Sequence, residues 1–105
     1  MPLPTPNYVF QEADASLAEC SEVLTQCLNY HIAIQVNSVN LNDTPCIIIE
    51  HSLDGVEFAE LDRFDIECSP IIWQKERFAG HYLRICYEPK ANTTGTFDVI
   101  LGNKY

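Results

Sequence analysis

Apolar and polar residues alternate along most of the chain after residue 29. Between Tyr30 and Val36 every second residue is large and apolar, and His31, Ala33 and Gln35 stand between them. Successive side chains of a strand point to opposite faces, so this period of two predicts a strand with one buried side. The phase changes at residue 38, which indicates a bulge or a crossing into a second sheet.

Similar patterns predict further strands at residues 46–53, 56–61, 71–73, 81–88 and 96–101. In the last two of these strands, the residues expected to face inward are Leu83, Ile85, Tyr87, Phe97, Val99 and Leu101. Asp54 and Gly55 separate the first two. An Asp-Gly pair between two apolar runs favours a type I′ hairpin, because that turn needs positive φ at both central residues.

The spacing of these segments predicts the fold class. Short strands separated by turn residues at intervals of about 8–12 residues are typical of a β-sandwich. Alternation on one side only excludes a parallel sheet that is covered on both faces. We therefore expect an all-β, antiparallel β-sandwich of the jelly-roll or Ig-like kind, with six to eight short strands.

Residues 13–28 carry conflicting signals. The apolar residues of this segment fall at helical spacing, at Leu17, Cys20, Leu24, Cys27 and Leu28. Ser16 and Glu19 have the spacing of a capping box, and the segment alternates poorly as a strand. The local pattern therefore favours a helix here.

The first twelve residues are expected to form an extended arm, and residues 13–105 a single domain. Alternate prolines fix φ and disfavour helix, and apolar residues follow them. The arm has two interpretations of equal weight: it covers an edge of its own fold, or it docks on a neighbouring subunit. The candidate partner-binding residues are Pro2, Leu3, Pro4, Pro6, Tyr8 and Phe10.

With a net charge of −9 we do not expect ordinary nucleic-acid binding, because an acidic surface repels phosphates. It is compatible with docking on a basic protein surface. We expect neither a secretory signal nor a membrane span, since Met1 is followed by prolines and no apolar run is long enough. Five cysteines, an odd number, are interpreted as mostly buried, reduced thiols of a protein made in a cytoplasm.

No residues with catalytic, metal-binding or cofactor-binding roles are predicted, and we expect a protein that is not an enzyme. His31, His51 and His81 lack the spacing of a ligand pair, and no nucleophile can be matched with a base and an orienting group. The carboxylates between residues 54 and 67 are interpreted as a solvated face. Trp73 is either a core residue or a platform for stacking on a sugar.

The segments YHIAIQV (Tyr30–Val36), CIIIEHSLDGVEFAELD (Cys46–Asp62) and YLRICYEPKANTTGTF (Tyr82–Phe97) carry a family resemblance. From about Ser21 to Leu101 the chain resembles small β-sandwich proteins of tailed-bacteriophage virions. The resemblance implies a non-enzymatic virion structural protein, a capsid decoration (cement) or head–tail accessory subunit, made in the host cytoplasm. It implies a major capsid, neck or tail protein of the same virion as partner, and a homo-oligomer in the assembly. It also favours a strand near Cys20–Leu24 over the helix.

Two alternatives stay open. The S-x-D-G segment, Trp73 and the tyrosines also resemble discoidin-like and other carbohydrate-binding sandwiches, which implies a carbohydrate-binding module. The acidic charge permits a nucleic-acid mimic that blocks a basic groove. A mimic would need its carboxylates gathered on one face of the molecule.

Overall fold

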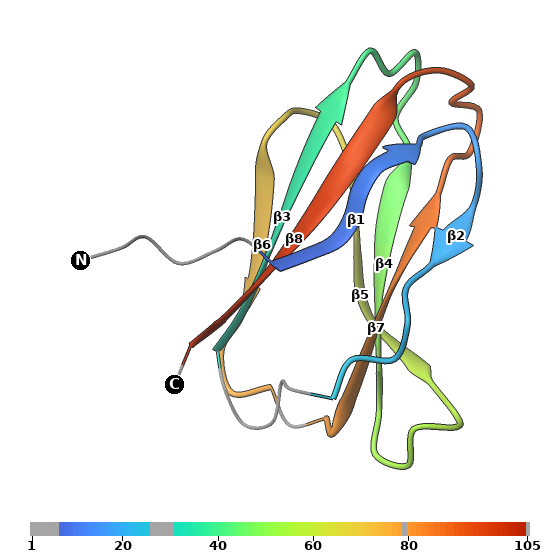
Figure 1. Ribbon diagram of the computed structural model, residues 1–105. Helices are drawn as coiled ribbons and strands as arrows, with labels where there is room; N and C mark the ends of the chain where they lie inside the picture. Colours follow the sequence, from blue (N-terminus) through green and yellow to red (C-terminus); the bar gives the residue numbers. More distant parts are fainter. Residues whose placement is uncertain (1–6, 26–30, 79, 105) are drawn as a thin grey trace.

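A computed structural model describes residues 7–25, 31–78 and 80–104, with the side chains of residues 103 and 104 left out. The described residues form eight strands and no helix, so none of them forms a helix that could cross a membrane (Figure 1). The strands are β1 (Asn7–Asp14), β2 (Glu19–Cys20), β3 (His31–Val39), β4 (Cys46–Ser52), β5 (Ala59–Asp65), β6 (Ile71–Lys75), β7 (Tyr82–Glu88) and β8 (Thr96–Lys104).

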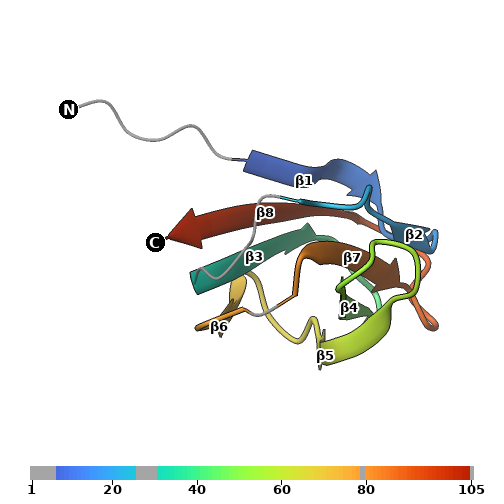
Figure 2. The same cartoon turned by 90° about the horizontal axis from the view of Figure 1, so that it is seen from below.

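The strands form two antiparallel sheets of four strands each. Sheet A has the order β1-β8-β3-β6 and sheet B the order β2-β7-β4-β5, and Figure 2 shows them as two layers. Strand β1 pairs with β8, β2 with β7, β3 with β6 and β4 with β5. This nested pairing is that of one long hairpin rolled into a sandwich, so the fold is a jelly roll. The predicted fold class is confirmed, and of its two variants the jelly roll is the observed one.

The core lies between the sheets and follows the predicted alternation. Ile32, Ile34 and Val36 of β3 have no exposed surface, while the residues between them are half-buried. The expected inward faces of β7 and β8 are also buried, and the Tyr87 and Phe97 rings stack with centroids 4.0 Å apart. Each such buried side chain contributes roughly 1.5–3 kcal/mol of transfer free energy, so these alternating faces hold the sheets together.

The phase change at residue 38 marks a crossing and not a bulge. Strand β3 keeps an unbroken register with β8 as far as the pair of Val39 and Thr96. Asn40 then adopts a positive φ of 60°, and the chain passes from sheet A to sheet B. Val39 is 57% exposed because it sits on the outer side of β3.

The type I′ turn predicted at residues 54–55 is wrong, although the two strands do pair. Strands β4 and β5 do pair as neighbours, but residues 53–58 connect them, and within this loop only Gly55 has positive φ, 78°. The loop is longer because the Ser52 and Asp54 side chains satisfy its backbone groups, as described below. As a result β5 begins at Ala59 and not at residue 56.

In residues 13–25 the strand interpretation is confirmed over the helix. Cys20 belongs to β2, and Leu24 forms an isolated bridge with Leu83 of β7. The Ser21 N–H also donates to the Ile85 carbonyl oxygen at 2.8 Å. Pairing with the open edge of β7 thus outweighs the local helical spacing, and Cys27 and Leu28 lie outside the described residues.

Residues 7–12, predicted as part of the arm, lie in β1 and pair with β8. Phe10 is 8% exposed, and its ring centroid lies 5.4 Å from that of Phe97 in the core. Tyr8 is 41% exposed. The remaining arm candidates, Pro2, Leu3, Pro4 and Pro6, lie outside the described residues.

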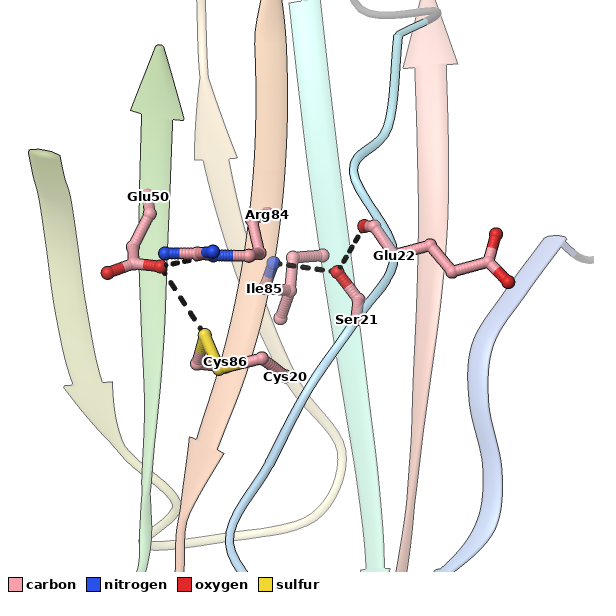
Figure 3. The surroundings of a disulfide bond; sticks show 7 residues. All are labelled: Cys20, Ser21, Glu22, Glu50, Arg84, Ile85 and Cys86. Atoms are coloured by element: carbon pink, nitrogen blue, oxygen red, sulfur yellow. Dashed lines mark hydrogen bonds and ion pairs between the residues drawn. A yellow bond between two sulfur atoms is a disulfide. The ribbon is translucent and has the colours of Figure 1, made fainter. Parts of the chain in front are cut away.

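The expectation of reduced cysteines is wrong for one pair. Cys20 and Cys86, direct partners in the β2–β7 register, form a disulfide (Figure 3). Cys46 is a buried free thiol and Cys68 an exposed one. The strand register brings together two cysteines 66 positions apart, a contact that spacing along the chain does not reveal.

Candidate functional site

The loop between β4 and β5, residues 53–58, lies at one end of the sandwich, away from the β3–β4 and β7–β8 connections (Figure 1). Its backbone is tied to two side chains. The Ser52 hydroxyl accepts hydrogen bonds from the N–H groups of Asp54 and Gly55 at 3.2 and 2.9 Å. Asp54 Oδ1 accepts from the N–H groups of Val56 and Glu57 at 2.8 and 3.0 Å, and from the Ser52 hydroxyl at 2.8 Å.

These contacts have an electrostatic consequence. The N–H groups of Val56 and Glu57, followed by the Ser52 hydroxyl, stabilise the charged carboxylate and hold the pKa of Asp54 below its usual value of 3.8. The Asp54 carboxylate is therefore ionised at neutral pH, the form that accepts these hydrogen bonds.

Gly55 fits the loop against sheet B. A Cβ atom at this position would lie 3.1 Å from Cζ of the Tyr82 ring, and its φ of 78° disfavours other residues. The loop backbone thus packs directly on the ring of Tyr82. A loop held by side chains at one side and by a ring at the other is a rigid support.

The rigid loop exposes two aliphatic side chains. Leu53 is 70% exposed and Val56 is 77% exposed, the two highest values among the large hydrophobic residues described. Exposed aliphatic side chains on an ordered loop are available for contact, because a partner can bury them without first ordering the loop.

An open hollow of about 550 Å³ lies beside Leu53. Its lining consists of His51, Ser52, Leu53, Asp54, Glu57, Phe58, Ala59 and Gly80. The Arg84 guanidinium lies 4.4 Å from the centre of the Phe58 ring and also bonds Glu50 at 2.7 Å, which covers that face of the ring. The hollow offers apolar contact beside the carboxylates of Asp54 and Glu57.

The lining residues do not form a nucleophile–base pair in the part of the chain that is described. Ser52 donates to Asp54, and His51 packs near the Phe78 ring at a centroid distance of 6.3 Å. His31 bonds Gln74 at 2.8 Å on sheet A and is thus on the other sheet from His51 of β4. The His81 N–H donates to the Ser52 carbonyl oxygen at 3.0 Å, at the end of β4. Among the described residues, no group of three or more His, Cys, Asp or Glu side chains is placed to hold a metal ion.

Trp73 is not an open stacking platform. Its indole Nε1 donates to Asp62 Oδ2 at 2.7 Å, and the ring packs against the core. Trp73 is half-buried because it lies at the margin of the sandwich. Its strand β6 is an edge strand of sheet A, and β5 is an edge strand of sheet B.

The acidic segment between residues 54 and 67 is partly neutralised. Glu60 pairs with Arg63 at 2.6 Å and Asp65 with Lys90 at 2.7 Å, both on the surface, where such pairs contribute about 0–1 kcal/mol. Asp98 lies on sheet A, away from these groups. The described carboxylates thus do not gather on one face, as a nucleic-acid mimic would require.

Sequence reasoning did not identify Leu53 and Val56. The available signal was two aliphatic residues flanking Asp-Gly inside a polar turn, which was interpreted as the ends of two strands. Of the predicted contact residues with described positions, Tyr8 is on the surface and Phe10 is in the core. No protein-family model matches the chain, and no match is found among the curated proteins.

Proposed function

We propose that this protein is a non-enzymatic virion structural subunit, of the capsid decoration or head–tail accessory type, that attaches to another virion protein through its β4–β5 loop. The observation that carries the proposal is the exposure of Leu53 and Val56 on a loop held by Ser52 and Asp54.

Binding strength follows from this geometry. Burying a leucine and a valine releases roughly 1.5–3 kcal/mol each, and the rigid loop loses little conformational entropy on binding. One such contact is weak. Repetition over many copies on a particle raises avidity without any new contact, provided that the copies engage at the same time.

The charge of the site favours a basic partner surface. Asp54 and Glu57 lie in the same loop as the two aliphatic residues, within a chain of net charge −9. A partner with a small apolar patch and a basic rim would complement this end of the sandwich. Attachment is then expected to weaken as salt screens the charges.

The fold and the family resemblance support the virion assignment. Jelly rolls occur repeatedly in viral capsid and lectin domains. A fold alone does not define a function. The choice of a virion protein over a lectin therefore rests on the exposed loop and on the family resemblance. The partner is expected to be the major capsid protein or a neck or tail protein of the same virion.

A sedimentation experiment tests the proposal. Shells prepared without this protein are mixed with the wild-type chain, with Leu53→Asp, with Val56→Asp, or with Leu17→Asp as control. Leu17 is 60% exposed in the β1–β2 connection, so Leu17→Asp places the same kind of substitution on an exposed residue outside the loop. We expect wild type and Leu17→Asp to co-sediment and the two loop variants to stay in the supernatant. Failure of the wild type to associate would refute the proposal.

Carbohydrate binding is a second candidate, favoured by the hollow beside Phe58 and by the carboxylates of Asp54 and Glu57, which accept hydrogen bonds from sugar hydroxyls. Trp73 does not support it, because its ring is engaged with Asp62 and the core. A glycan array with wild type and Glu57→Gln separates the candidates. A glycan bound by wild type and lost in the variant would favour this alternative.

A further inference from the structure

One segment at the edge of sheet B has few ties to the rest of the fold. Residues 16–25 contain β2, which among the described strands pairs only with β7; we name these residues the strap. No strap residue is buried, and Leu17 and Val23 are 60% and 41% exposed. Of the strap residues, only Leu24 packs against the core, and it is partly buried. Segments that bury so little apolar surface open at low cost in free energy.

Hydrogen bonds at an exposed edge join the strap to β7 beyond the two residues of β2. The Ser21 N–H donates to the Ile85 carbonyl oxygen at 2.8 Å, and the Ser21 hydroxyl accepts from the Ile85 N–H at 3.0 Å (Figure 3). Leu24 and Leu83 exchange N–H to carbonyl hydrogen bonds at 2.7 and 2.9 Å. Water competes for these groups when the strap moves away, so each bond adds little net stability.

A second hollow, of about 270 Å³, lies between the end of the strap and sheet A. Its lining consists of Asn7, Glu22, Val23, Leu24, Thr25 and Leu101. Protein cores are close-packed and leave few spaces larger than a water molecule. The end of the strap is therefore not tightly packed against sheet A.

Ala15 holds the chain in place just before the strap. It has no exposed surface, and its N–H donates to the Gly95 carbonyl oxygen at 3.0 Å. Its own carbonyl oxygen accepts from the Tyr87 hydroxyl and from the Asn92 side chain. None of these contacts involves the strap, so Ala15 stays attached when the strap moves.

The disulfide between Cys20 and Cys86 ties the strap to β7 covalently, and its two ends differ in access (Figure 3). Cys20 is exposed, whereas Cys86 is only 7% exposed. Glu50 Oε1 lies 3.4 Å from Cys86 Sγ, so a thiolate that approached Cys86 would meet a carboxylate. Access and charge both favour attack of a thiolate on the Cys20 sulfur.

We propose that the Cys20–Cys86 disulfide is a redox latch: a dithiol opens it, and the strap then leaves β7 while the rest of the sandwich stays folded. One thiolate of the dithiol bonds to Cys20 Sγ, the disulfide breaks, and its electron pair leaves on Cys86 Sγ, which takes up a proton. The second thiolate of the dithiol displaces Cys20 Sγ, which is protonated in turn, and the dithiol becomes a disulfide. Two electrons and two protons thus pass to the protein.

The reduced form has a hydrogen-bond acceptor ready for the thiol of Cys86. A disulfide sulfur carries no hydrogen, so the contact between Cys86 Sγ and Glu50 Oε1 is not a hydrogen bond while the disulfide is intact. After reduction the Cys86 thiol donates to this oxygen, which Arg84 Nε already binds at 2.7 Å. This hydrogen bond exists only in the reduced form and favours it. The inference goes beyond the proposed function and does not depend on it.

Native-state hydrogen exchange at several low denaturant concentrations tests the latch. The full chain carries Cys68→Ser, which removes the exposed free thiol, and is compared in the oxidised form and after reduction with dithiothreitol. The matched control is Cys20→Ser with Cys86→Ser on the same background. Its strap should exchange as in the reduced chain, with or without dithiothreitol.

Two sets of backbone amides are compared. The strap contacts are reported by the amides of Ser21, Leu24 and Leu83, and the rest of the sandwich by those of Ile34 and Val36 in the central strand β3. In the reduced chain we expect the strap amides to exchange at least roughly tenfold faster than in the oxidised chain and than the β3 amides. Their exchange should hardly depend on denaturant, because local opening exposes little surface, whereas exchange in β3 should depend on it steeply.

Three results would each overturn the proposal. The first is a native chain whose disulfide resists dithiothreitol. The second is unfolding of the whole chain on reduction, seen as loss of protection in β3 together with the strap. The third is a reduced, folded chain in which strap and β3 amides exchange at the same rate and with the same denaturant dependence, because the strap would then open only by global unfolding.

Discussion

The side chain of Asn92 donates a hydrogen bond to the carbonyl oxygen of Ala15, 77 positions earlier in the chain, at 2.9 Å. The Tyr87 hydroxyl donates to the same oxygen at 2.7 Å. Asn92 Oδ1 accepts from the N–H groups of Asn42 and Asp43 at 2.8 and 3.1 Å. One buried amide thus joins the β1–β2, β3–β4 and β7–β8 connections at the end of the sandwich away from the β4–β5 loop (Figure 1).

Replacing Asn92 with alanine is expected to lower the free energy of unfolding by about 2–3 kcal/mol. Asn92 is 2% exposed, and its loss leaves buried backbone groups without their partners. Denaturant unfolding measures the change. The control is Thr93→Ala in the same loop, where an exposed contact to Asn42 is lost and we expect less than about 1 kcal/mol. Equal effects of the two changes would contradict this role.

Tyr87 makes stability depend on alkaline pH. Burial, followed by the charge of Asp14, raises the pKa of Tyr87 from 10.0 to about 12. A folded pKa above the unfolded one stabilises the fold below the unfolded value, and this contribution is lost as pH rises through the folded value. Unfolding experiments should therefore show a loss of roughly 2–3 kcal/mol between these pH values. Tyr87→Phe should lack this loss, and should be about 1 kcal/mol less stable at neutral pH.

The link between Cys20 and Cys86 gives a direct chemical prediction. Alkylation without reduction, followed by mass spectrometry, should label the exposed Cys68 and leave the peptides of Cys20 and Cys86 joined. Because the bond closes a long loop and ties the short strand β2 to β7, Cys20→Ser with Cys86→Ser should lose about 2–4 kcal/mol of stability. Recovery of both cysteines alkylated in the unreduced protein would exclude the bond.

Asp54 is expected to control the order of the β4–β5 loop. Its pKa lies below 3.8 because loop N–H groups bind its charged form, so its contribution is present above that pH and lost as pH falls through the lower, folded value. NMR shifts of the Val56 and Glu57 amides should report a midpoint below 3.8. Asp54→Ala should weaken shell attachment several-fold although Leu53 and Val56 are unchanged in sequence, because the loop that positions them loses these hydrogen bonds. A midpoint above that value would contradict the loop geometry.

The strands were predictable because their signal is local. In β3 and β8 each buried residue is followed by one that is more exposed, and this period requires no knowledge of partners. The edge strand β2 could not be predicted from a local signal. Cys20 and Leu24 take extended positions only because they pair with β7. There the helical spacing from Leu17 onward was a competing local signal.

The candidate site depended on details that the pattern does not carry. An Asp-Gly pair indicated a turn between β4 and β5, and that pairing is observed. Its length depends on Ser52 and Asp54 binding the backbone of the loop, and this moves Val56 from a strand into an exposed position.

The most direct measurement is a density map of the virion particle with the protein in place. We predict that a neighbouring virion protein lies against Leu53 and Val56, with basic side chains near Asp54 and Glu57. A map in which the β4–β5 loop faces solvent, and a different surface makes the attachment, would contradict this account.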